Sequence, residues 1–194
     1  MQRAMLAEEV VSVLSKSRHA RAPETDEPSE RRIALKKAIR TIEILPKLEY
    51  PDPIGAQAMR AMKSLGCLSA RHVRSCRLID LGGGLDPNEA LAAARRFFLD
   101  TATQEMRLLD PEPGAIGGAA DRWRAEIWPQ TDFDDAGRSV RDLLVRAGWR
   151  VPLVRIGRGL RIFAKYPRTQ IENALVRALV DSRCERLVVV PDIG

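Results

Sequence analysis

Two stretches of the chain, HVRSCRLIDL at 72–81 and LVRIGRGLRI at 153–162, share Val-Arg-x-x-Arg followed by aliphatic residues. The likeness extends in both directions at an offset of 83, then 82, then 81 residues, and each change falls in a predicted loop, where insertions are tolerated. Such an internal repeat constrains the fold more than any other feature, because each copy must form the same elements. The matched pairs include Ile44 and Ile127, Asp52 and Asp134, Gly55 and Gly137, Gly66 and Gly148, Arg74 and Arg155, Arg77 and Arg158, and Asp100 and Asp181.

Each copy predicts the same order of elements, which is strand, helix, strand, helix, strand. The alternating apolar residues of RTIEIL and WRAEIW are typical of a strand, and a proline that cannot donate to the ladder ends each one. Asp52 and Asp134 are suited to cap a following helix, and Gly66 and Gly148 to end it. The other strands are predicted at 71–81, 106–109, 150–163 and 187–190, and the second helices open at Asp86-Pro87 and Pro167-Arg168.

These elements predict an α+β fold in which helices pack on a mixed or antiparallel sheet. We expect a helix and a flexible linker over 1–32, one repeat over 33–110, a linker rich in Gly, Pro and Ala over 111–121, and a second repeat over 122–194. A unit of this size is marginally stable alone and leaves strand edges unpaired. We therefore expect the two tandem copies to pair as a pseudo-dimer, with the repeated Val-Arg strands at its centre.

Several short motifs of the repeat resemble the PurS family, the small subunit of phosphoribosylformylglycinamidine synthase. IEILPK and the following Asp52, Pro53, Gly55 and Ala58 are similar to the first strand and the helix start of that family. MRAMKSLG resembles the end of its helix, VRSCRLIDL and VRIGRGLRI its next strand, and DPNEA the acidic start of its second helix. The resemblance covers 40–110 and 123–190.

The chain departs from the family pattern in several respects. A glycine of the family is kept as Gly157 but replaced by Cys76, and the lysine that follows it is arginine in both copies. The second copy has Asp134-Asp135 where the family has Asp-Pro. PurS subunits are usually single units that associate with themselves, whereas this chain fuses two.

The resemblance implies a non-catalytic role. PurS bridges the glutaminase and the large synthetase subunit of the enzyme that converts formylglycinamide ribonucleotide to formylglycinamidine ribonucleotide with glutamine and ATP, so that ammonia passes between them. The chain is therefore expected to be an assembly subunit of this amidotransferase complex in purine biosynthesis, with those two subunits as its partners. The resemblance implies no cofactor for the small subunit itself, and it leaves further self-association of the fused pair open.

The charge and the cysteine content bear on nucleic-acid binding, on disulfide or metal sites and on the cellular compartment. The net charge is +6, but the basic residues are interleaved with acids, which favours a solvated surface over a nucleic-acid footprint. Cys67, Cys76 and Cys184 are odd in number and lack a CxxC spacing, so we expect no disulfide framework, no metal site and a reducing, cytoplasmic environment. No apolar run approaches the roughly 20 residues that a membrane span needs.

The sequence predicts no catalytic residue. His19 lies in the charged linker and His72 just before a strand, and neither has a plausible serine or cysteine partner nearby in the sequence for a nucleophile–base pair. The run 82–84 of glycines lacks the Lys-Ser or Lys-Thr of a phosphate loop and is typical of a strand-to-helix turn. The acidic run at 132–135 is better explained by helix capping than by metal binding.

The arginines that recur in register are the candidate binding residues. We expect Arg74, Arg77, Arg155 and Arg158, with Gly157, to form a partner interface that pairs with carboxylates of another subunit. Residues three apart in a strand point to opposite faces, unless a bulge at Gly157 intervenes, so one arginine of each pair is expected to face the partner. Arg74 and Arg155 are the first choices, and exposed charges without a partner are the alternative.

A second function class stays open. The same paired α+β units would also suit a stand-alone regulatory module that binds a small ligand or RNA. A base-stacking platform of Tyr or Phe on the sheet would favour RNA, and the sequence offers none. An enzyme acting alone is the third possibility.

Overall fold

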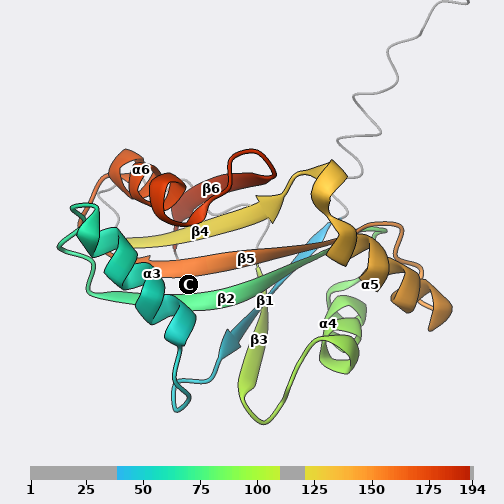
Figure 1. The fold of residues 1–194 in the computed structure, drawn as a ribbon. Coiled ribbons are helices and arrows are strands. Elements are labelled where there is room, and N and C mark those ends of the chain that lie inside the picture. Colours follow the sequence, from blue (N-terminus) through green and yellow to red (C-terminus); the bar gives the residue numbers. More distant parts are fainter. Residues whose placement is uncertain (1–38, 110–120, 193–194) are drawn as a thin grey trace, which may run out of the picture. The chain divides into compact units, whose positions relative to one another are not determined.

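The computed structural model describes residues 39–109 and 121–192, which lie in one compact unit (Figure 1). The predicted helix and linker over 1–32 and nearly all of the linker over 111–121 lie outside the described residues. The fold is α+β, as predicted. The first copy contains β1 (Arg40–Pro46), α3 (Pro53–Ser64), β2 (His72–Leu81), α4 (Pro87–Phe97) and β3 (Gln104–Leu109). The second contains β4 (Arg122–Pro129), the 3-10 turn η1 (Thr131–Phe133), α5 (Asp135–Arg146), β5 (Val154–Phe163), α6 (Arg168–Leu179) and β6 (Glu185–Pro191).

The described strands form one six-stranded sheet in the order β3-β1-β2-β5-β4-β6. Every pairing between neighbours in this sheet is antiparallel, so the mixed sheet that the sequence left open is not formed. The two strands with the repeated Val-Arg sequence, β2 and β5, lie side by side at its centre (Figure 1). Each edge is a short closing strand, β3 on one side and β6 on the other.

The two halves of the sheet have the same internal register. Ile42 of β1 pairs with Ile79 of β2, and the residues 83 and 81 positions later, Ala125 and Leu160, pair in the same way between β4 and β5. The β1–β3 and β4–β6 pairings obey the same two offsets. The offsets found in the sequence are therefore also the relation between the hydrogen-bonded ladders.

The ladder between the two central strands runs without interruption from His72 opposite Phe163 to Leu81 opposite Val154. Arg77 stands opposite Arg158, which is its own counterpart in the second copy. A pseudo-two-fold axis thus passes between these two arginines. The bulge that Gly157 would permit is not formed, because every residue of β5 from Val154 to Phe163 has one partner on β2.

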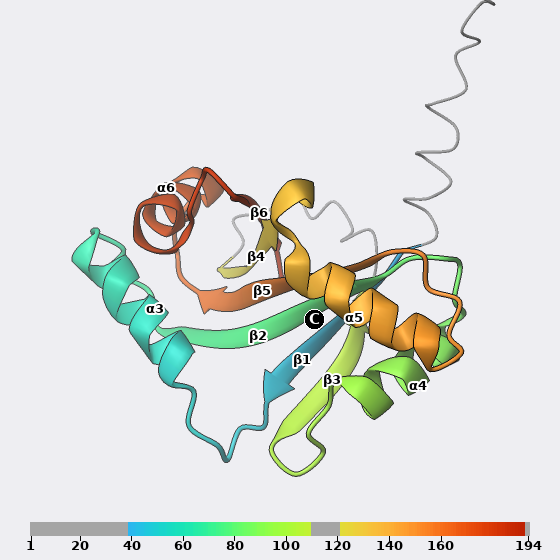
Figure 2. The same ribbon diagram turned by 45° about the vertical axis from the view of Figure 1, so that its right-hand side comes forward.

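All four described α-helices cover the same face of the sheet. Val73, Ile79 and Leu81 alternate onto one side of β2; the first packs with α3 and α6, and the other two pack with α4 and α5. Figure 2 shows the two helix pairs at opposite ends, with β2 and β5 running between them. Each apolar cluster is built from both copies, so neither half buries its core without the other. Each helix within 39–109 and 121–192 is too short or too polar to cross a lipid bilayer.

The recurring Asp-x-x-Gly fixes the first helix of each copy to the central strand. The Asp52 carboxylate accepts hydrogen bonds from the Gly55 amide, and Asp134 accepts from Gly137 in the same way, as the sequence predicts for helix caps. Asp52 also accepts from the amide and hydroxyl of Ser75, at 2.6 and 2.7 Å. Asp52 therefore joins the start of α3 to β2.

We expect Asp52→Ala to destabilise the protein by about 1 kcal/mol, the usual cost of a lost helix cap. Burial by itself raises the pKa of Asp52, but the hydrogen bonds from Gly55 and Ser75 outweigh it and hold the pKa below its ordinary value. The contribution of Asp52 to stability is thus present above the pKa of the unfolded carboxyl and is lost as the pH falls through the folded pKa. Urea unfolding of wild type and variant between pH 7 and pH 3 measures how the contribution of Asp52 to stability depends on pH.

Asp132→Ala is the control, because Asp132 is an exposed acid in η1 whose side chain caps no helix. Its effect on stability should be small and nearly independent of pH. An Asp52→Ala deficit that stays constant over the whole pH range would contradict the assignment.

Candidate functional site

The five predicted interface residues are divided between the two faces of the sheet. Arg77 and Arg158 point to the face that carries the helices and stand at the pseudo-two-fold axis. Arg74, Arg155 and Gly157 point to the opposite face, which none of the described helices covers. The strands therefore separate Arg74 from Arg77, and Arg155 from Arg158, as the spacing predicts for an unbulged strand.

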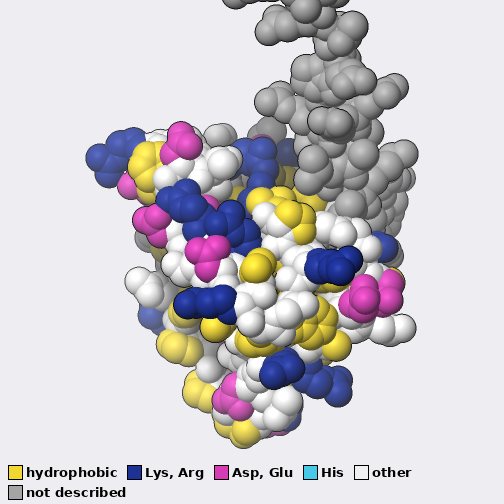
Figure 3. Space-filling model, turned by 90° about the vertical axis from the view of Figure 1, so that its right-hand side faces the viewer, with side chains coloured by type: hydrophobic (Ala, Val, Ile, Leu, Met, Phe, Trp, Pro, Cys, Tyr) yellow, Lys and Arg dark blue, Asp and Glu magenta, His cyan; other side chains and the backbone are white. Residues whose placement is uncertain are grey.

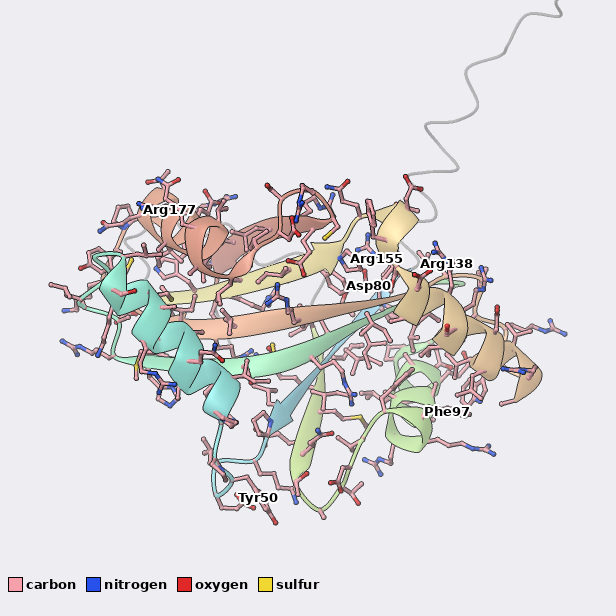
Figure 4. The ribbon with its side chains drawn as sticks, in the orientation of Figure 1. Tyr50, Asp80, Phe97, Arg138, Arg155 and Arg177 are labelled. Carbon is pink, nitrogen blue, oxygen red and sulfur yellow. The ribbon has the colours of Figure 1, made fainter. Side chains whose placement is uncertain are left out.

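Arg155 is held by a buried acid of the other copy. Its guanidinium donates to Asp80 at 2.7 and 3.2 Å (Figure 4). The guanidinium also lies over the ring of Trp128, 4.9 Å from the ring centroid. Burial raises the pKa of Asp80, while Thr41, which donates to it at 2.7 Å, and Arg155 oppose that shift. Arg155 thus links the copies, and a glutamate in its place would stand beside the Asp80 carboxylate.

Arg74 and Gly157 also have internal roles. Arg74 donates to the Pro46 carbonyl at 2.5 Å and to Glu105 at 3.3 Å. A Cβ on Gly157 would lie 2.6 Å from the Trp128 ring, so a side chain there would displace the tryptophan. Arg74, Arg155 and Gly157 each have a structural role within the chain. That they bind another subunit stays a prediction.

A buried carboxylate on this face was not singled out from the sequence. Glu43 is fully buried and accepts from Arg161 at 2.9 Å and from Arg107 at 2.6 Å. Its counterpart, Glu126, accepts from Arg124 and from the Trp128 indole. The available signal was the glutamate that both copies place between apolar residues of the first strand, where a solvent-exposed acid is the ordinary interpretation.

A groove lies on the helix-bearing face over the pseudo-two-fold axis, with a volume of about 680 Å³. We call it the axial groove. Its walls come from the loop after β1, the start of α3 and the end of α6, and its floor from the central strands. The residues used below are Pro46, Ile54, Gln57, Arg77, Gln104 and Ile156.

The two axial arginines cap the second helix of their own copies. Arg77 donates to the Phe98 carbonyl at the end of α4, and Arg158 donates to the Leu179 carbonyl at the end of α6 at 2.6 Å. Phe98 and Leu179 are counterparts at the offset of 81. Burial lowers the pKa of Arg77 from its ordinary value, although it remains a cation at neutral pH.

The two axial arginines differ in their acidic partners. Arg158 pairs with Glu185 at 2.7 Å, whereas the counterpart of Glu185 in the first copy is the neutral Gln104. Within 39–109 and 121–192, no acid forms an ion pair with Arg77. The floor of the axial groove therefore carries one guanidinium that has no acidic partner among the described residues. The carboxylate in the lining, that of Asp52, accepts from Gly55 and Ser75 instead.

The cysteines and the described histidine do not form a nucleophile–base pair. Burial first, and the Glu43 carboxylate second, raise the pKa of the Cys76 thiol well above its ordinary value, so it stays protonated. The ring of His72 packs edge-on against Phe163 instead. Among the described residues, no group of three or more His, Cys, Asp or Glu side chains gathers as a metal site would require.

The glycine run and the acidic run have structural positions. Gly83 and Gly84 adopt positive φ values of 112° and 72° in the turn between β2 and α4, which favours glycine there. A Cβ on Gly82 would meet Leu153 at 2.9 Å, so this turn packs closely on the loop before β5. Asp134 caps α5, as predicted, and Asp135 pairs with Arg138 in its first turn.

A comparison of the chain with models of known protein families and with curated protein sequences finds no match.

Proposed function

We propose that the chain is a non-catalytic, PurS-like assembly subunit, two tandem units forming a pseudo-dimer. In this proposal it bridges the glutaminase and the large synthetase subunit of the formylglycinamide ribonucleotide amidotransferase in purine biosynthesis. The observation that carries the proposal is the symmetric sheet, in which the motifs that resemble PurS occupy equivalent places in two βαβαβ halves. The Asp-x-x-Gly of the first motif is also the contact that fixes the first helix of each copy.

A bridge between two different proteins needs two different docking surfaces, and a fused pair whose copies have diverged supplies them. Each copy exposes large apolar side chains between its first strand and the end of its first helix. Exposed large apolar side chains are common at protein–protein contact sites. We call the set Leu48, Tyr50 and Ile54, in the loop after β1 and the first turn of α3, cluster one, and the set Phe133, Leu143 and Val145, distributed along η1 and α5, cluster two (Tyr50 is labelled in Figure 4).

The stand-alone binding module remains the second candidate, and the axial groove favours a small ligand over RNA. Trp123 and Trp128, the indole side chains of the described sheet, are 7% and 3% exposed and offer no surface on which bases could stack. On the face shown in Figure 3, Lys and Arg side chains occur in separate groups among acidic and apolar ones. A continuous basic surface for a phosphate backbone is not present on that face.

We expect the tagged protein to capture both the glutaminase and the large synthetase subunit encoded in the same genome. Ile54→Glu should weaken the capture of one subunit, and Phe133→Glu that of the other, by about tenfold or more, because a charge is placed in an apolar contact. Quantitative pull-down with each subunit separately measures this.

Leu68→Glu is the matched control, since Leu68 is an exposed apolar residue, 74% accessible, outside both clusters. It should leave both interactions intact. Failure of the wild-type protein to bind either subunit would refute the bridging role, and equal losses in all three variants would remove the two clusters from the interface.

A further inference from the structure

The axial groove has the properties of a small-molecule site rather than of an incidental surface depression. Its volume of about 680 Å³ lies within the range usual for ligand pockets. Pro46, Ile54 and Ile156 give it apolar walls, and Gln57, Gln104 and Arg77 supply a few polar groups at its border and floor. Apolar walls with a few converging polar groups are typical of sites that bind organic ligands.

The charge in the groove is unbalanced in a way that an anion would correct. Arg77 and Arg158 are direct cross-strand partners on the same face, where like charges repel. Glu185 compensates Arg158 with both of its oxygens, at 2.7 and 2.9 Å. Arg77 donates to the Phe98 carbonyl, which uses part of the donor capacity of a guanidinium with five N–H groups.

Gln104, the counterpart of Glu185, shows that the difference between the copies is one of charge and not of shape. The Gln104 side-chain oxygen accepts from the Asp100 amide at 3.2 Å, and the Glu185 oxygen accepts from the Asp181 amide at 2.9 Å. Asp100 and Asp181 are counterparts, so the two side chains occupy equivalent places. Only the carboxylate is missing from the first copy.

We propose that the axial groove binds a small organic anion, a carboxylate or a phosphate monoester on an apolar body, whose charged group pairs with Arg77. The guanidinium presents parallel N–H donors that match either anion. The anion takes the place that Glu185 holds against Arg158, and its apolar body lies along Ile54 and Ile156. The anion receptor of this site, Arg77, lies outside both exposed apolar clusters, and Ile54 of cluster one is a wall residue that the site shares with the proposed docking surface.

The test is an NMR titration of the full chain with benzoate and with phenyl phosphate, read from the backbone amides of Gly157 and Gly159 on the groove floor. We expect saturable shifts of these amides with at least one of the two compounds. Whichever binds more tightly shows whether the groove prefers a carboxylate or a phosphate monoester. Benzyl alcohol, which lacks the charge, and inorganic phosphate, which lacks the apolar body, should each bind about tenfold more weakly or worse.

Gln104→Glu is the decisive variant, because it gives Arg77 a carboxylate equivalent to the one that Glu185 gives Arg158. It does so without removing an arginine. It should weaken binding of the aryl anion by about tenfold or more. Glu185→Gln is the matched control; it releases Arg158 and should leave binding unchanged or stronger. Both variants keep the side-chain acceptor for the neighbouring amide, and their NMR spectra report whether the fold is intact.

Two results would overturn the proposal. One is the absence of saturable shifts at the groove floor with either aryl anion, as expected if the groove serves only as a protein contact. The other is equal binding by wild type and Gln104→Glu, which would show that any anion lies elsewhere on this basic protein. Neither result bears on capture of the amidotransferase subunits.

Discussion

Replacing Glu43 by alanine should destabilise the protein by about 3–5 kcal/mol, the cost of breaking a buried ion pair by removing one partner. Glu43 is fully buried in the first strand, and its carboxylate is shared by the guanidiniums of Arg161 and Arg107. Arg161 is 8% exposed and comes from the central strand of the other copy, so it would lose one buried acidic partner while keeping Asp192 at 3.3 Å. Denaturant unfolding followed by circular dichroism measures the difference.

Glu105→Ala is the control for this prediction. Glu105 pairs with Arg74 at 3.3 Å on the same face of the sheet, but its side chain is 53% exposed. An ion pair at such a site contributes about 0–1 kcal/mol. Equal small effects of the two substitutions would mean that Glu43 does not join the copies through Arg161.

Alanine at Gly55, and separately at Gly137, should each destabilise the protein by about 1–3 kcal/mol through overpacking. A Cβ on Gly55 would lie 2.4 Å from the Val73 carbonyl, and one on Gly137 would lie 2.5 Å from the Val154 carbonyl. Backbone atoms of the central strands cannot move aside as a side-chain end could. The helix would therefore lift from the strand, and its cap would weaken.

Ser139→Ala tests whether any substitution in the first helix has this effect. Ser139 is an exposed position of α5, two residues after Gly137, and alanine there should change stability by less than about 0.5 kcal/mol. If Gly137→Ala were as mild as Ser139→Ala, the close approach of helix and strand would not be a constraint on the repeated motif. Thermal unfolding of the three variants side by side gives the answer.

The helices and strands could be predicted from the sequence because each of them has a counterpart in the other copy of the repeat. The first strands start and end close to the predicted residues, Asp52 and Asp134 cap their helices, and Gly66 and Gly148 follow the helix ends with φ of 95° and 90°. A cap or a turn depends on local residues, so the sequence can predict it. The same cap or turn at equivalent positions of both copies would rarely arise by chance.

The contacts between the copies could not be predicted in the same way. Glu43 and Arg161 are 118 residues apart, and Arg155 meets Asp80 only because β2 and β5 pair antiparallel in one particular register. A repeat shows that two units are alike but does not state how they face each other. For the same reason, the position of Arg77 and Arg158 on the axis follows from the ladder and not from their spacing in either copy.

The sharpest measurement of the bridging role compares glutamine with ammonia as nitrogen donor. In a reconstituted mixture of the large subunit and the glutaminase, adding this protein should raise the glutamine-dependent rate on the order of 10²-fold, because a bridge converts the second binding event into an intramolecular one. The ammonia-dependent rate should change little. A glutamine-dependent rate that is the same with and without the protein would contradict the bridging function.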